Sequence, residues 1–130
     1  MRKPLNRPTD TELKILRVLW DQGACTVRQV HEVLVATQED LAYQAVLRMM
    51  ALMMDKGLLV RDDGERSHVY RAAQPQEEVQ RSLLDDLLER AFGGDALQML
   101  AAAFTGRKVK TEDREAIARM LDEADRGGGK

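Results

Sequence analysis

Hydrophobic residues in the first third of the chain recur at helical spacing in two runs, and a polar capping pattern opens each run. Thr9 and Glu12 form a capping box, in which the threonine side chain bonds a helical amide and the glutamate reaches back. Thr26 and Gln29 repeat this pattern. The apolar positions are Leu13, Leu16, Leu19 and Trp20 in the first run, and Val27, Val30, Val33 and Leu34 in the second. Two helices are predicted, the first ending before Gly23.

A third helical run extends from about Ala42 to Lys56 and ends at Gly57, a residue that suits the left-handed position after a helix. Two strand-like segments follow, Leu58–Arg61 and Ser67–Arg71, joined by the charged turn Asp62–Arg66. Three helices followed by a charged hairpin are the order of elements in a winged helix. In that module the third helix lies in the major groove of DNA and the hairpin flanks it.

Residues 75–126 are predicted to form three further helices. Pro75 suits the first position of one, Asp95 caps a short apolar helix that ends at Phe104, and Thr111 begins the last. A piece this small is hard to stabilise alone, so we expect it to pack against the same region of a second chain. The alternative is that it folds back on the first part. The residues expected at the dimer interface are Leu84, Leu87, Leu88, Leu97, Leu100, Phe104, Ile117 and Leu121.

The predicted fold is therefore mainly α with a small β-hairpin. We assign residues 1–74 to a winged helix-turn-helix domain, residues 75–126 to a helical dimerisation domain and residues 127–130 to a disordered tail. No apolar run approaches the roughly 20 residues that span a bilayer, and the N-terminus lacks the apolar core of a secretory signal. The single cysteine, Cys25, fits a reducing compartment, so we expect a cytoplasmic protein without membrane contact.

The net charge gives DNA binding only weak support. Residues 1–74 contain 11 Lys and Arg against 10 Asp and Glu, so this part is barely cationic. Positive charge would have to be placed locally, or doubled by dimerisation.

With these motifs in order, the chain resembles the penicillinase-repressor family, which regulates β-lactamase and methicillin-resistance operons. The resemblance extends from about Thr9 to Glu123. It rests on Thr11-Glu12-Leu13, Val18-Leu19-Trp20, Thr26-Val27-Arg28-Gln29-Val30, Leu41-Ala42-Tyr43, Val46-Leu47, Asp55-Lys56-Gly57-Leu58-Leu59, Val69-Tyr70-Arg71 and Ala91-Phe92-Gly93-Gly94-Asp95. It implies a winged helix followed by a dimerisation region, and repression by a homodimer bound to an inverted-repeat operator of double-stranded DNA.

The outward face of the third helix would contact the bases. Helical spacing directs five residues to the core: Ala42, Val46, Met49, Met50 and Met53. The candidate DNA-binding residues are Tyr43, Gln44, Ala45 and Arg48 on the helix, with Arg66 and His68 on the hairpin. Gln44 can pair with adenine, Arg48 with guanine or a phosphate, and Ala45 with a thymine methyl. The alternative is that these are ordinary solvated residues.

This outward face is unusually apolar. It carries Ala45, Leu47, Ala51 and Leu52 where relatives usually have threonine and arginine. Either these residues pack against another element, or the operator differs from the familiar one. A second functional class follows from the same face, a protein-interaction module that docks through Leu47, Ala51 and Leu52.

The resemblance also implies that a sensor-triggered protease relieves repression by cutting an Asn-Phe bond in the dimerisation region. The matching bond here is Ala103–Phe104, which keeps the phenylalanine but lacks the asparagine. We favour Phe104 as a dimer-core residue over a cleavage site. A winged-helix regulator that responds to a small ligand is a further alternative.

Catalytic and metal-binding chemistry find little support. Cys25 and His31 are six residues apart, which is not a zinc-ligand spacing, and the pair Gly93-Gly94 follows a helix rather than a strand. We therefore expect no enzyme activity, no cofactor and no metal.

Overall fold

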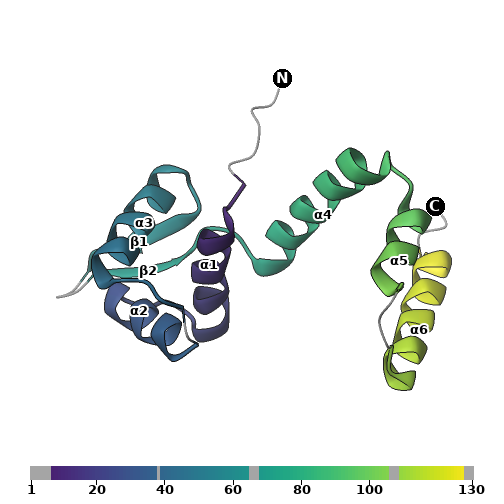
Figure 1. Cartoon of the computed structure of the whole chain (residues 1–130), viewed down its shortest axis with the longest axis horizontal. Coiled ribbons are helices and arrows are strands. Elements are labelled where there is room, and N and C mark those ends of the chain that lie inside the picture. The colour runs from purple at the N-terminus through teal and green to yellow at the C-terminus, as the bar shows by residue number, and fades with distance from the viewer. Residues whose placement is uncertain (1–6, 38, 65–67, 106–108, 128–130) are drawn as a thin grey trace. The chain divides into compact units, whose positions relative to one another are not determined.

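The computed structural model describes residues 7–37, 39–64, 68–105 and 109–127. These residues form six helices and one two-stranded hairpin, so the predicted fold class is confirmed (Figure 1). Contacts divide the chain into two compact units, Met1–Leu84 and Asp85–Lys130, and the division falls inside α4. None of the described helices combines the length and the apolar composition that a membrane span requires.

The first unit contains the predicted winged helix and the start of α4. Its elements are α1 (Asp10–Gln22), α2 (Val27–Ala36), α3 (Tyr43–Asp55), β1 (Leu59–Asp62), β2 (Val69–Ala72) and the first part of α4 (Gln76–Phe92). Both capping boxes form as predicted. Thr9 Oγ1 accepts the amide of Glu12 at 3.2 Å, and the carboxylate of Glu12 accepts the amide of Thr9 at 3.0 Å. The equivalent distances between Thr26 and Gln29 are 3.1 and 2.8 Å.

The end of α3 is fixed by Gly57. Its φ of +82° lies in the left-handed region, where a side chain would strain the backbone. The amide of Leu58 then donates to Met53 O at 2.9 Å, an arrangement that satisfies a carbonyl of the last helical turn. Leu58 therefore belongs to the helix-ending turn, and β1 begins at Leu59, one residue later than predicted.

The apolar faces of α1, α2 and α3 meet in one core. Its fully buried side chains are Ile15, Leu16, Val30, Leu34, Val46, Met50 and Met53. The predicted core face of α3 is confirmed at Val46, Met50 and Met53, while Met49 is partly buried against the same cluster. The placement of Ala42 in the core was wrong. Ala42 is the N-cap residue of α3 and is exposed, because it precedes the helix whose periodicity directed it inward.

The hairpin pairs Leu59 with Ala72 and Arg61 with Tyr70 in antiparallel register. A third chain segment joins it at Cys25, whose amide and carbonyl bond Tyr70 at 2.9 and 2.8 Å. This bridge fastens the α1–α2 connection to β2. The Cys25 side chain is buried, and burial raises the pKa of its thiol. Cys25 is therefore a packed, protonated thiol.

The second unit contains the end of α4, α5 (Ala96–Phe104) and α6 (Thr111–Gly127). Asp95 caps α5 as predicted, since its side chain accepts the amide of Gln98 at 3.0 Å. Among the described residues of α5 and α6, no side chain is buried. The unit therefore exposes apolar surface that an isolated globular domain would cover.

Candidate nucleic-acid interface

The face of α3 opposite the core carries Gln44, Leu47, Arg48, Ala51 and Leu52, all of them exposed. The predicted outward direction of these five residues is therefore confirmed. Leu47 is 38% exposed and Leu52 is 54% exposed, so both keep apolar surface accessible to a partner. Ala45 is partly buried at the flank of this face.

Tyr43 in the first turn of α3 is held by two side chains of α2. Its ring meets the ring of His31 edge to face, with centroids 5.7 Å apart and an interplanar angle of 86°. The guanidinium carbon of Arg28 lies 5.8 Å from the same ring centroid, within cation–π distance. This cluster has no local signal along the chain, because its residues come from two helices joined by a loop.

His31 also fastens the segment that precedes α3. Its Nε2 lies 2.9 Å from Leu41 O, and because a carbonyl only accepts, that nitrogen carries the proton. His31 is thus a structural residue at the start of α3. The described residues contain no group of three or more His, Cys, Asp or Glu placed to hold a metal ion.

A hollow of about 340 Å³ lies where the starts of α2 and α3 meet β2. Its lining residues are Thr26, Val27, Arg28, Tyr43, Leu47, His68 and Tyr70. None of these described lining residues is acidic. The hollow therefore joins the start of the predicted contact helix to the hairpin, and its lining includes both apolar side chains and the basic residue Arg28.

An acidic side chain of the hairpin turn lies against two basic side chains of the hairpin. Asp63 Oδ1 lies 2.6 Å from Arg61 Nε and 3.0 Å from His68 Nδ1. One carboxylate therefore engages both described basic side chains at this end of the hairpin. Arg66, the other predicted hairpin contact, lies outside the described residues.

Most of the residues predicted at the dimer interface are exposed to solvent. Leu84, Leu87, Leu97, Leu100, Phe104 and Leu121 are exposed, whereas Leu88 and Ile117 are partly buried. Leu97 reaches 78% exposure and Leu121 reaches 57%. Ala103, the other side of the candidate cleavage bond, is exposed in α5.

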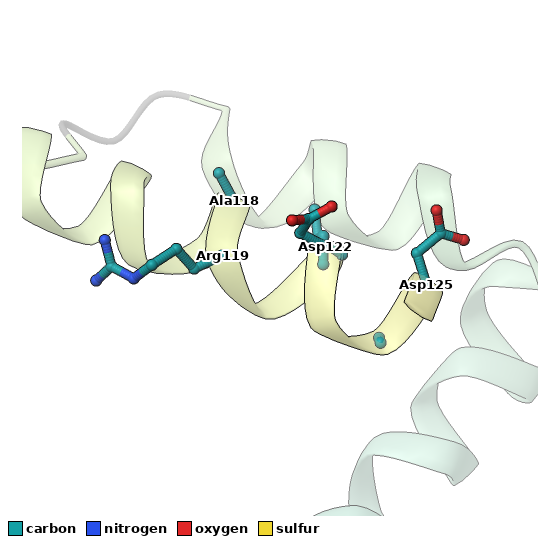
Figure 2. Close-up of a pocket in the computed structure, with 6 residues that line it drawn as sticks. Ala118, Arg119, Asp122 and Asp125 are labelled. Atoms are coloured by element: carbon teal, nitrogen blue, oxygen red, sulfur yellow. The ribbon is translucent and has the colours of Figure 1, made fainter. Parts of the chain in front are cut away.

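Figure 2 shows a shallow hollow on α6, with Ala118, Arg119, Asp122 and Asp125 labelled along the helix. The residues that line it all come from α6, so it is the open surface of one helix rather than an enclosed site. Small and apolar residues share this surface with two carboxylates. Its composition fits an interface edge better than a catalytic pocket.

Comparison with known proteins agrees with this arrangement. Residues 8–123 match the family model described as Penicillinase repressor. Two relatives, each called Transcriptional regulator BlaI, come from Mycobacterium tuberculosis strains CDC 1551 / Oshkosh and ATCC 25618 / H37Rv. Each is 32% identical over 126 residues, which cover 96% of this chain and 90% of the relative.

Proposed function

The chain belongs to the penicillinase repressor family, and from this premise we propose that it is a homodimeric transcriptional repressor that binds an operator in double-stranded DNA. The observation that carries the proposal is the exposed face of α3. Gln44 and Arg48 lie one helical turn apart on it, directly opposite Val46 and Met50 in the core.

In this proposal the first two turns of α3 enter the major groove. Gln44 pairs with an adenine edge, and Arg48 pairs with guanine or a phosphate. Tyr43, held by Arg28 and His31, fixes the direction from which the helix enters. The hairpin lies beside the helix, where His68 and Arg66 meet the DNA backbone or the minor groove. Phosphate contacts position the protein, and base contacts supply the specificity.

We propose that the exposed apolar residues of α4, α5 and α6 form the homodimer interface. Leu97 and Leu121 support this, because an apolar side chain that stays in water forfeits the free energy of burial. A two-fold dimer presents two copies of α3. Its operator would therefore contain two inverted half-sites separated by one helical turn of DNA or a multiple of it.

Phe104 fits the dimer interface better than a cleavage site. It is 41% exposed and is the last residue of α5, where Thr105 N bonds Ala101 O at 3.1 Å. Proteases cut preferentially in accessible loop tips, so cutting Ala103–Phe104 would first require the end of α5 to open. An inducing protease therefore remains a secondary proposal for this chain, beside relief by a small ligand.

The test is fluorescence anisotropy of the full-length protein with the DNA just upstream of its own gene, at several salt concentrations, beside a scrambled duplex. Tight, selective binding that weakens steeply with salt is expected, with two chains per site. Arg48→Ala should weaken operator binding by roughly 1–3 kcal/mol. Arg17→Ala, which removes the same charge from an exposed position on α1, is the matched control.

Weak and equal binding to both duplexes would contradict the proposal for that promoter. The second functional class, a protein-interaction module, would then gain support from the exposed Leu47, Ala51 and Leu52. An apolar protein interface of this kind should respond little to salt, which separates the two classes.

A further inference from the structure

Leu47 lies at one edge of the outward face of α3, next to the hollow that α3 shares with α2 and β2. At about 100° of rotation per residue, Gln44, Leu47, Arg48 and Ala51 fall within one sector of the helix. Gln44 and Arg48 can form hydrogen bonds with base edges, whereas Leu47 has neither a donor nor an acceptor. An aliphatic side chain that is 38% exposed therefore lies beside two polar residues, about 60° from Gln44 and about 100° from Arg48 around the helix axis.

The surroundings of Leu47 favour a small apolar group as its partner. Leu47 borders the 340 Å³ hollow together with the side chains of Val27, Tyr43 and Tyr70. A methyl group placed at the edge of this hollow would contact aliphatic and aromatic carbon. In the major groove of DNA, the only methyl group that a base presents is the C5-methyl of thymine.

The charges around Leu47 favour DNA over an apolar protein partner. Arg28 and His68 line the same hollow, and Arg48 follows Leu47 on the helix. Of the described residues that line the hollow, none is acidic. Within α3 the sequence has no acidic residue before Asp55 at its last position. The guanidinium groups of Arg28 and Arg48 complement the phosphates beside a groove, whereas the imidazole of His68 is engaged by Asp63.

Resting on the proposed DNA-binding function, we propose that Leu47 is a specificity-determining residue that recognises the C5-methyl of a thymine in each operator half-site. Cytosine at that position lacks the methyl and presents an amino donor that Leu47 cannot satisfy. Gln44, nearly one turn earlier on the helix, recognises an adenine. The two residues together select an A·T-containing half-site.

The experiment uses the full-length protein and an operator selected from a pool of random duplexes. Each thymine of the half-site is replaced in turn by deoxyuridine, which removes only the methyl group, and binding is measured by fluorescence anisotropy. At one position in each half-site, the replacement should weaken wild-type binding about fourfold. This is the change in affinity expected when one buried carbon group is removed from an apolar contact. Leu47→Ala should bind the thymine and deoxyuridine duplexes equally.

Leu52→Ala is the matched control. Leu52 is an exposed leucine on the same helix, but it lies five residues later and is rotated by about 140° from Leu47. This variant should keep the wild-type preference for thymine. Thermal unfolding of both variants checks that the fold is retained.

Two different failures can be told apart. If the operator is bound tightly but no deoxyuridine replacement distinguishes wild type from Leu47→Ala, the thymine contact is wrong and the repressor proposal stands. If no duplex is selected from the pool, the repressor proposal and the thymine contact fail together.

Discussion

Lys56 Nζ lies 2.8 and 2.9 Å from the two carboxylate oxygens of Glu12, although the residues are 44 positions apart in the chain. Glu12 is buried, and the same carboxylate accepts the amide of Thr9 in the capping box. One side chain therefore closes the start of α1 and fastens the residue that ends α3. The contact fixes the proposed DNA-contact helix against the rest of the core.

Glu12→Gln tests the ionic part of this contact. Glutamine keeps the capping box, as Gln29 does at the start of α2, but it removes the charge that faces Lys56. The free energy of unfolding should fall by about 1–3 kcal/mol, because the ammonium of Lys56 loses its carboxylate partner, although part of the Lys56 side chain stays solvated. Urea denaturation measures the change. Glu32→Gln, at an exposed position of α2, should change stability by less than about 0.5 kcal/mol.

The same carboxylate predicts a pH dependence of stability. Burial alone would raise the pKa of Glu12, but hydrogen bonds from Lys56 and Thr9 outweigh it and hold the pKa below its ordinary value of 4.5. A lowered pKa in the folded state stabilises the fold above the unfolded value, and this stabilisation is lost as the pH falls through the folded value. The stability difference between wild type and Glu12→Gln should therefore be constant near neutral pH and shrink below about pH 4.5. A difference that grows on acidification would contradict the assignment.

Asp63→Asn tests the counter-charge on the hairpin. Asp63 engages both Arg61 and His68, so its negative charge opposes the approach of phosphates to this part of the hairpin. If the protein binds DNA as proposed, the variant should bind its operator roughly fivefold more tightly at low salt. This factor corresponds to about 1 kcal/mol, the interaction energy of two unit charges in contact in water. The salt dependence of binding should also steepen. Asp21→Asn, an equal charge change on α1, should leave binding unchanged, and equal gains in both variants would place the effect in net charge alone.

The helices could be predicted from sequence because their signals are local. The capping residues Thr9 and Thr26 and the terminal Gly57 act within one helical turn, so composition along the chain is enough to find them. The bridge from Cys25 to Tyr70 could not be found in this way. Its two residues are 45 positions apart, and the residues around Cys25 show no strand pattern.

In the candidate site, too, the local features could be predicted from sequence and the contacts between separate elements could not. Helical periodicity placed Leu47 and Arg48 on the outer face of α3. The contact of Tyr43 with Arg28 and the ion pair of Asp63 with Arg61 depend instead on how separate parts of the chain meet. Sequence periodicity identifies which residues are outward. It does not identify which outward residues are already engaged by neighbours, and that decides what remains available to a ligand.

Leu121→Glu tests the proposed dimer interface. Leu121 is 57% exposed on α6, and burying a carboxylate against the apolar face of a second chain would carry a large desolvation cost. The variant should sediment as a monomer at concentrations where wild type is a dimer, and its operator binding should weaken because the two half-sites are no longer linked. Leu52→Glu, at the 54% exposed leucine of α3, introduces the same charge outside the proposed interface and should stay dimeric. A wild-type protein that is monomeric at every concentration, or a Leu121→Glu variant that remains a dimer, would remove this surface of α6 from the interface.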